Sequence, residues 1–255
     1  MDPEQNALQS SASTRFNVPQ LAVFVTLKSK PGQRDALREL WQERARNYAA
    51  ENPLETSYVY AFDISDDTVV TVTEVFESLD AFHLNARAKW FKDYMSDVTA
   101  LLDGEPTYHM AIPQWTKPND HASRGATSSA PQSGIAKFVN LLPSAGPIKK
   151  VQDYLKLPMA ISVSLKTQPG KRDAVKLLWD QQVRQRASEN SSETDYVYAF
   201  DMRDDTTIRI GEVFETADAF HQMAHAKWFK SYMKEVTALL DGKPEYRMAT
   251  PQWIK

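Results

Sequence analysis

The sequence of 255 residues contains no cysteine. This absence excludes disulfide bonds, thiolate metal sites and cysteine nucleophiles. Glycine is scarce, with eight residues, and neither a glycine-rich phosphate-binding motif nor the catalytic motifs HExxH and GxSxG occur. The net charge is only −3, so we expect no nucleic-acid partner. The composition still permits small-molecule chemistry that uses acidic, basic and aromatic side chains.

Long apolar runs are missing as well. The longest, such as residues 21–27, are far shorter than the roughly 20 residues that cross a bilayer, so we expect no membrane partner. Residues 1–13 lack the basic start and apolar centre of a secretory signal. The charged fraction of 25% and the hydrophobic fraction of 42% are typical of globular proteins. A cytoplasmic, folded protein is the prediction.

An internal repeat is the most informative feature that is present. Residues 21–115 and 159–253 align without a gap, and 56 of the 95 positions are identical. A repeat of this length is a duplicated domain rather than a solenoid unit. Outside the two repeats we expect a disordered N-terminal tail over residues 1–20 and a linker over residues 116–158.

The linker divides into two parts. Residues 116–134 are of low complexity, whereas residues 135–158 carry apolar residues at helical spacing. The linker holds six Lys or Arg against two Asp or Glu, and repeat one holds nine against fifteen. Two interpretations follow. The second part is a lid over the acidic first repeat, or it is a tether with one packed helical turn.

Each repeat predicts the element order βαββαβ. Apolar alternation indicates strands, helical spacing indicates helices, and Ser78 is a suitable N-cap for the second helix, which Asp103–Gly104 ends. In repeat one the predicted strands cover 21–27, 56–63, 68–76 and 107–113, and the predicted helices cover 34–51 and the segment from Ser78 to Asp103. This is the ferredoxin-like α+β arrangement, with both helices on one face of an antiparallel sheet.

Such a sheet leaves its second face uncovered. Two copies in one chain can bury these faces against each other, which closes an intramolecular, pseudo-dimeric α+β barrel. The alternative, two separate domains on a string, exposes an apolar sheet face to water. We therefore expect the barrel, as a monomeric pseudo-dimer or as a homodimer of it.

Two histidines occupy equivalent positions of the repeat, His83 and His221. On one continuous helix, His83 shares a stripe with Trp90 and Tyr94, and a stripe facing the sheet places an imidazole between helix and strands. His83 and His221 are then either catalytic proton acceptors or core histidines bonded to backbone carbonyls. The pair His221 and His225 has helical metal-ligand spacing in repeat two alone, and we expect no metal site.

Two glutamates stand on an apolar strand face. Glu74 shares a strand face with Val70, Val72 and Phe76, and Glu212 is the equivalent residue of repeat two. A carboxylate in such surroundings is paired, protonated or functional. A salt bridge or exposure at a strand end is the plainer interpretation, and a catalytic carboxylate is the other.

Aromatic residues gather at the same positions. They are candidates for the walls and polar anchors of a site for a planar substrate, although aromatic residues at this spacing also fill ordinary cores. The candidate binding residues are Asn85 together with Tyr58, Tyr60, Trp90, Tyr94, Tyr196, Tyr198, Trp228 and Tyr232.

The repeat resembles the antibiotic biosynthesis monooxygenase (ABM) domain of the dimeric α+β barrel superfamily. The likeness is carried by the helix opening at 30–37, the strand-to-helix passage at 74–82, and Trp90–Phe91, with their counterparts in repeat two. The resemblance implies cofactor-independent oxygenation of aromatic polyketides, anthrones or hydroquinones. In such enzymes an ionised substrate reduces O₂ directly, and the protein supplies a base, polar anchors and a dry pocket.

Two positions depart from the family pattern. A histidine common in the family aligns with Asn85 and Met223, and the iron-ligand histidine of haem-degrading relatives aligns with Met95 and Met233. The resemblance therefore disfavours haem degradation. We expect two pockets, and the differences between Asn85 and Met223 and between Arg87 and His225 indicate that they are unequal.

The leading hypothesis is a cofactor-free monooxygenase of polyketide-type secondary metabolism. It would act on a phenolic or quinone-like small molecule with O₂. One alternative is a non-oxidative cyclase, isomerase or lyase on the same barrel. The other is a barrel that binds a ligand without catalysis.

Overall fold

The computed structural model describes residues 18–117 and 151–255. Each repeat folds in the predicted order, with each of its two helices divided in two. Repeat one consists of β1 (Leu21–Lys28), α2 (Arg34–Arg44), α3 (Arg46–Glu51), β2 (Glu55–Asp63), β3 (Val69–Phe76), α4 (Leu79–Arg87), α5 (Lys89–Leu101) and β4 (Thr107–Thr116). Ser78 accepts a hydrogen bond from the Ala81 amide at 3.0 Å, which confirms the predicted N-cap.

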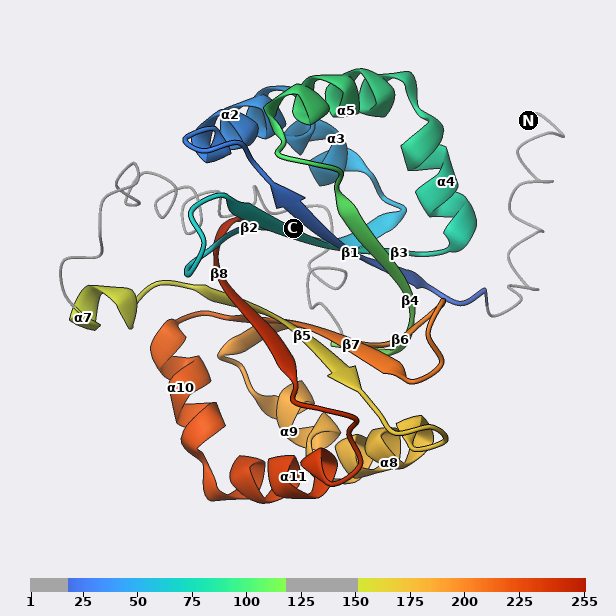
Figure 1. Ribbon diagram of the computed structural model, residues 1–255, viewed down its shortest axis with the longest axis vertical. Coiled ribbons are helices and arrows are strands. Elements are labelled where there is room, and N and C mark those ends of the chain that lie inside the picture. Colours follow the sequence, from blue (N-terminus) through green and yellow to red (C-terminus); the bar gives the residue numbers. More distant parts are fainter. Residues whose placement is uncertain (1–17, 118–150) are drawn as a thin grey trace, which may run out of the picture.

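Repeat two has the same order and is preceded by the short helix α7 (Val151–Tyr154). Its elements are β5 (Met159–Lys166), α8 (Arg172–Gln182), α9 (Arg184–Glu189), β6 (Glu193–Asp201), β7 (Thr207–Phe214), α10 (Ala217–His225), α11 (Lys227–Thr237) and β8 (Glu245–Ile254). Figure 1 shows the two repeats above and below a shared set of strands, with their helices on the outside.

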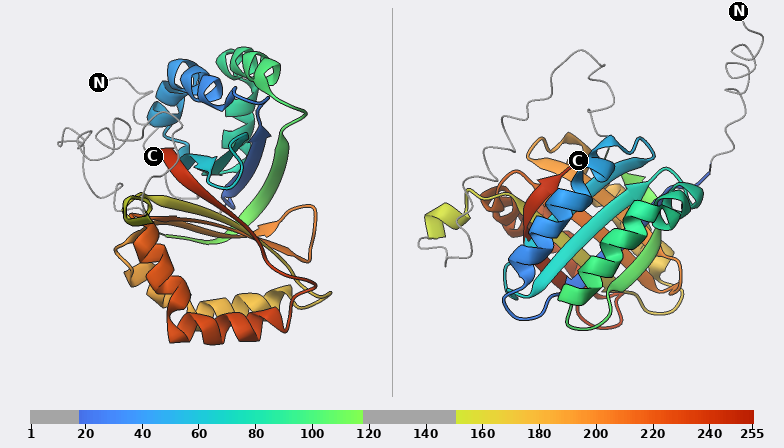
Figure 2. Two further views of the ribbon diagram at one scale, coloured as in Figure 1. Left: turned by 60° about the vertical axis from the view of Figure 1, so that its left-hand side comes forward. Right: turned by 90° about the horizontal axis from the view of Figure 1, so that it is seen from above.

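The eight strands form one closed barrel in the order β1-β3-β2-β8-β5-β7-β6-β4, and β4 pairs with β1 to close it. The two repeats join where β2 pairs with β8 and where β4 pairs with β6. Both views in Figure 2 show the helices outside this barrel. The predicted pseudo-dimeric α+β barrel is confirmed, and two separate domains on a string are excluded.

The fourth strand of each repeat is longer than predicted. The prediction for β4 ended at Pro113, whereas the strand continues to Thr116. Its last residues pair with β6 of the other repeat, Trp115 with Tyr198 and Thr116 with Val197. That partner lies far away in the sequence, so alternation within the segment could not indicate the extension.

Each predicted helix is interrupted. Ala45 separates α2 from α3, and Ala88, with an extended ψ of 142°, separates α4 from α5. The stripe that was expected to carry His83 together with Trp90 and Tyr94 assumed a single helix, so that expectation was wrong. His83 lies on α4, whereas Trp90 and Tyr94 lie on α5.

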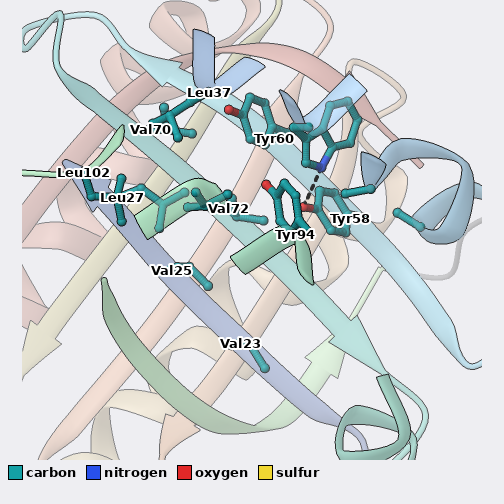
Figure 3. Packing of buried hydrophobic residues seen from close by; sticks show 14 of the residues in the cluster. Val23, Val25, Leu27, Leu37, Tyr58, Tyr60, Val70, Val72, Tyr94 and Leu102 are labelled. Carbon is teal, nitrogen blue, oxygen red and sulfur yellow. Dashed lines mark hydrogen bonds between the residues drawn. The ribbon is translucent and has the colours of Figure 1, made fainter. Parts of the chain in front are cut away.

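Strand alternation divides the apolar residues into three layers: the helix-side core of repeat one, the barrel interior, and the helix-side core of repeat two. Tyr58 and Tyr60 face the helices, whereas Val59 and Ala61 face the barrel interior. Figure 3 shows the helix-side core of repeat one. Trp41 is fully buried there, and its ring stacks on Tyr60 with centroids 4.8 Å apart. Burial of such large aromatic side chains supplies most of the stability of this layer.

The barrel interior holds asymmetric contacts between equivalent positions of the two repeats. Ser57 and Asp195 occupy the same repeat position, and the Ser57 hydroxyl donates a hydrogen bond to the Asp195 carboxylate. Thr73 and Gly211 are likewise equivalent, and a Cβ added at Gly211 would lie 3.1 Å from Cγ2 of Thr73. The duplicated halves therefore differ where they meet.

The described end of the linker packs on repeat two. The carbonyls of Leu155 and Leu157 accept hydrogen bonds from the amides of Asp218 and Ala217, at 3.0 and 2.7 Å, in the first turn of α10. Residues 118–150, and with them most of the predicted linker, lie outside the described residues, as does the predicted tail up to residue 17. Among the described helices, none is long and apolar enough to span a membrane.

Candidate functional site

A cavity of about 70 Å³ lies in repeat two between the sheet and the helices α9, α10 and α11. Four of the residues singled out from the sequence line it: Glu212, Tyr196, Trp228 and Tyr232. Glu193, Arg186, Met223 and Tyr246 line it too. The cavity is thus a mainly apolar space, partly lined by aromatic rings, with two carboxyl groups and one guanidinium group.

Glu212 lies on β7 and faces this cavity. Within residues 18–117 and 151–255 it forms no salt bridge, so the ion-pair interpretation fails there. Burial raises the pKa of the Glu212 carboxyl from 4.5 to about 7, and a hydrogen bond from Tyr196 opposes part of that rise. A carboxyl that titrates near neutral pH in a mainly apolar cavity is suited to general acid–base chemistry.

Glu193 was not identified from the sequence. It begins β6, and simple alternation from Asp195 points it to the barrel interior. The strand register shifts between Glu193 and Asp195, and this bulge turns Glu193 toward the helices. Burial raises the Glu193 pKa to about 9, with a further rise from Glu212 and an opposing effect of Lys117. At neutral pH Glu193 is therefore protonated and can donate a hydrogen bond.

Tyrosine hydroxyls surround the two carboxyl groups. The Nε1 of Trp179 donates a hydrogen bond of 2.8 Å to the Tyr196 hydroxyl, which fixes the direction in which that hydroxyl can donate. Burial, followed by the nearby Glu212, raises the pKa of Tyr232 and of Tyr246 above the ordinary value of 10. These phenols stay protonated and are hydrogen-bond donors at neutral pH.

Arg186 and Trp228 lie together on the helix side of the cavity. The guanidinium carbon of Arg186 lies 4.9 Å from the centre of the Trp228 ring. Arg186 is exposed to solvent and still lines the cavity, so it marks the mouth. Met223 lies on the same cavity wall, at the position that matches Asn85 of repeat one.

Repeat one keeps the same two carboxyl groups. Burial raises the pKa of Glu74 to about 8, and burial with the neighbouring Glu74 raises the pKa of Glu55 to about 9. Tyr58 accepts a 2.9 Å hydrogen bond from Trp41, drawn as the dashed line in Figure 3, where Tyr94 lies beside Tyr58. The deep part of the site is therefore duplicated.

The mouth of repeat one is different. Tyr48 replaces Arg186 and stacks on Trp90, with the rings 4.2 Å apart and an interplanar angle of 3°. Asn85 replaces Met223. The two repeats thus share carboxyl and phenol groups with raised pKa values, but they differ at the positions of Arg186 and Met223.

Other candidate residues lie away from the cavity. His221 is not among the residues that line it, and its ring contacts Tyr154 of α7, with centroids 6.1 Å apart. His83 has the matching place on α4. Tyr198 stacks on Trp179 inside the core, as Tyr60 does on Trp41, and within the described ranges neither hydroxyl has a hydrogen-bond partner. A catalytic role for the two histidines stays a prediction.

The described residues contain no cluster of three or more metal-ligand side chains. His225 lies beside His221, but its Nδ1 hydrogen-bonds the His221 carbonyl at 2.8 Å. That contact engages one of the two ring nitrogens that a metal could use.

The ends of β4 and β8 pair with strands of the other repeat, and this pairing places side chains of each repeat in the core of the other. Trp115 of repeat one packs on Trp179 and Tyr196 of repeat two, with ring centroids 5.4 Å apart in both contacts. The Nζ of Lys117 donates hydrogen bonds of 2.6 Å to the carbonyls of Ala187 and Asn190, at the end of α9. Each site is therefore supported by both halves of the chain.

Residues 21–95 match the family model of antibiotic biosynthesis monooxygenase. The first repeat is an ABM domain. The second repeat is a further copy of it, because 56 of 95 positions are identical and the elements follow the same order. A search of curated proteins found no match.

Solved structures share the fold of nearly the whole chain. The chain is similar to a candidate monooxygenase from Fusobacterium nucleatum, with 12% identity over 93% of this chain and 94% of the other and a TM-score of 0.73. It is also similar to a candidate monooxygenase from Lactobacillus acidophilus, with 8% identity over 92% of this chain and 95% of the other and a TM-score of 0.69. An anthrone oxidase-like protein is similar with 10% identity over 93% of both chains and a TM-score of 0.56. At these identities the likeness concerns the fold.

Proposed function

We propose that the chain is a cofactor-independent monooxygenase that acts on a small phenolic or quinone-like compound in the cavity of repeat two. The single observation that carries this proposal is Glu212, a half-buried glutamate with a pKa near 7 that lines a mainly apolar cavity with aromatic walls. The ABM family match supports a monooxygenase-like activity. The solved anthrone oxidase-like structure agrees with an aromatic substrate.

Glu212 would accept the phenolic proton of the substrate. Tyr196 donates to Glu212 already, and Glu193, Tyr232 and Tyr246 supply further donors for the phenolate oxygen. Removal of the proton makes the ring electron-rich, and the ring then passes electrons to O₂. A phenol with a free ring position would give a quinone and water, so that one oxygen atom enters the product and the other leaves as water.

The cavity has to widen when a ring enters. Its volume of about 70 Å³ is below the ~150 Å³ of a cavity known to hold one benzene ring. We therefore favour compounds of one or two rings. Polyketide-type metabolism and a cytoplasmic location stay predictions of the sequence.

The test is oxygen uptake by the full chain, with a chelator present, on a panel of phenols, hydroquinones and anthrones. We expect uptake that falls by about 10²- to 10⁴-fold in Glu212→Gln, the range for loss of a general base. His221→Ala, on the neighbouring helix but outside the cavity lining, should retain uptake. Unchanged uptake in Glu212→Gln would refute the role of this carboxyl, and uptake lost in His221→Ala alone would assign the base to the histidine. Turnover without oxygen uptake would identify a non-oxidative enzyme.

A further inference from the structure

The two repeats share the floor of their sites but not the mouth. This difference bears on substrate class, and the inference below rests on the proposed function of the repeat-two cavity. The residue that distinguishes the mouths is Arg186 in repeat two and Tyr48 in repeat one.

Arg186 is held in place but keeps most of its donors unused. It lies on α9 (Arg184–Glu189), its guanidinium lies over the Trp228 ring, and its Nη1 donates to the Gln182 carbonyl at 3.3 Å. Among residues 18–117 and 151–255, no carboxylate forms an ion pair with it. A guanidinium has five N–H donors in a planar fork that matches a carboxylate. Arg186 is therefore a preformed, unneutralised cation at the rim of a cavity.

The charges within the cavity fix the direction in which a charged ligand can bind. Within the part of the chain that the structure describes, Arg186 is the only cationic side chain that lines the cavity. The acidic side chains that line it, Glu193 and Glu212, are at the sheet. An anionic group pushed toward the sheet would meet the Glu212 carboxylate and lose its water. An anionic group at the rim would meet Arg186 and keep part of its hydration.

We infer that Arg186 selects an anionic aromatic substrate for repeat two, a phenol or hydroquinone that carries a carboxylate on the ring. The carboxylate pairs with the guanidinium at the mouth, and the phenolic hydroxyl points inward to Glu212. In repeat one, Tyr48 covers Trp90 and offers no positive charge at the same place. Repeat one therefore has no preference for an anionic ligand.

The test compares two probes of the same shape, 2,5-dihydroxybenzoate and its methyl ester. Binding is measured by isothermal titration calorimetry on the full chain under nitrogen, so that the result does not depend on turnover. We expect the acid to bind at one site and more tightly than the ester. Arg186→Tyr, which installs the residue of repeat one, should weaken binding of the acid by about 10- to 100-fold and leave the ester within about threefold.

Arg184→Tyr is the matched control. Arg184 lies on the same helix and is also exposed, but it pairs with Asp180 at 3.6 Å and does not line the cavity. This variant loses the same charge from the same helix and should bind both probes as the wild type does. Equal loss in both arginine variants would reveal only a general effect of net charge and overturn the inference. So would a preference for the acid that survives Arg186→Tyr, or no preference in the wild type.

Failure of the proposed function gives a different result. A preference for the acid that depends on Arg186, without oxygen uptake, supports an anion-selective binding site and refutes the oxygenase. Oxygen uptake with equal affinity for acid and ester supports the oxygenase and refutes selection by Arg186. A second site of equal affinity for the acid would refute the assignment to repeat two alone.

Discussion

The two halves of this barrel agree in their cores and differ at their entrances. Trp41 and Trp179 are buried alike and donate to equivalent tyrosines. Each half also holds one buried glutamate, Glu55 or Glu193, and one half-buried glutamate, Glu74 or Glu212, and all four have raised pKa values. The residues over Trp90 and Trp228 differ, a tyrosine in one half and an arginine in the other. Packing restricts the core residues, because protein interiors tolerate little change of side-chain volume. The entrance faces solvent and was free to diverge.

The largest expected effect tests the part that is common to both halves. Trp41→Ala and Trp179→Ala should each lower the free energy of unfolding by about 3–5 kcal/mol, because each removes a fully buried ring and leaves the partner tyrosine hydroxyl without its donor. Chemical denaturation followed by tryptophan fluorescence measures both. Losses that differ by more than about 2 kcal/mol would contradict the equivalence of the two cores.

The next prediction compares the catalytic capacity of the halves. Glu74→Gln removes from repeat one the carboxyl that Glu212 provides in repeat two. If the Arg186 mouth sets the site of reaction, Glu74→Gln should retain at least half of the oxygen uptake on a carboxylate-bearing substrate. The loss in Glu212→Gln should be about 10²-fold or more. Equal losses in the two variants would mean that both pockets turn over this substrate.

Another prediction concerns the pH dependence of stability. The pKa values of Glu55 and Glu193 rise on folding from 4.5 to about 9, and both side chains are buried. A carboxyl with a raised folded pKa stabilises the fold below its unfolded pKa, and that stability is lost as the pH rises through the folded value. The melting temperature should therefore fall between pH 5 and pH 9.

The double variant Glu55→Gln/Glu193→Gln provides the check on this trend. It lacks both titrating groups, so its melting temperature, followed by circular dichroism, should fall less over the same pH range. Each single variant should account for a similar share, because the two glutamates are equivalent. A variant that declines as steeply as the wild type would assign the trend to other groups.

The smallest expected effect tests the barrel interior, where the halves meet. A Cβ at Gly211 would lie 3.1 Å from the side chains of both Thr73 and Val197. Gly211→Ala should therefore cost about 1 kcal/mol, and Thr73→Ala should recover part of that cost in the double variant. Urea unfolding of the four proteins gives the coupling energy. Strict additivity would show that Thr73 is not the restricting neighbour.

The sequence predicted most of the fold because its signals are local. Alternation in β2 separated Tyr58 from Val59, Ser78 marked a helix start, and the repeat itself required a partner for each sheet. The longer β4 escaped notice because its partner is a strand of the other repeat. The break at Ala88 escaped because alanine, with a high helix propensity, gives no signal there.

The site was predicted in part. Glu212, Tyr196, Trp228 and Tyr232 do come together, because alternation and helical spacing place them on the inner faces of their elements. Glu193 required knowledge of a bulge, since the two-residue period assigns it to the opposite face. Arg186 was hidden for another reason: an exposed arginine on a short helix looks like any solvated surface residue. The one available signal was a difference between the repeats. Arg186 is replaced by Tyr48 in repeat one, directly before an alanine that both repeats share.

The hydrogen bond between Ser57 and Asp195 has a consequence for descent by duplication. In a dimer of identical subunits every mutation arrives twice, so a position that faces its own copy can pair only with the same residue. Two aspartates there would repel, and two serines would lack the charge. Once a single gene encoded both halves, each position could mutate alone, and a donor could be matched with an acceptor. Such unlike pairs bind one half to the other more specifically than either half can bind a copy of itself.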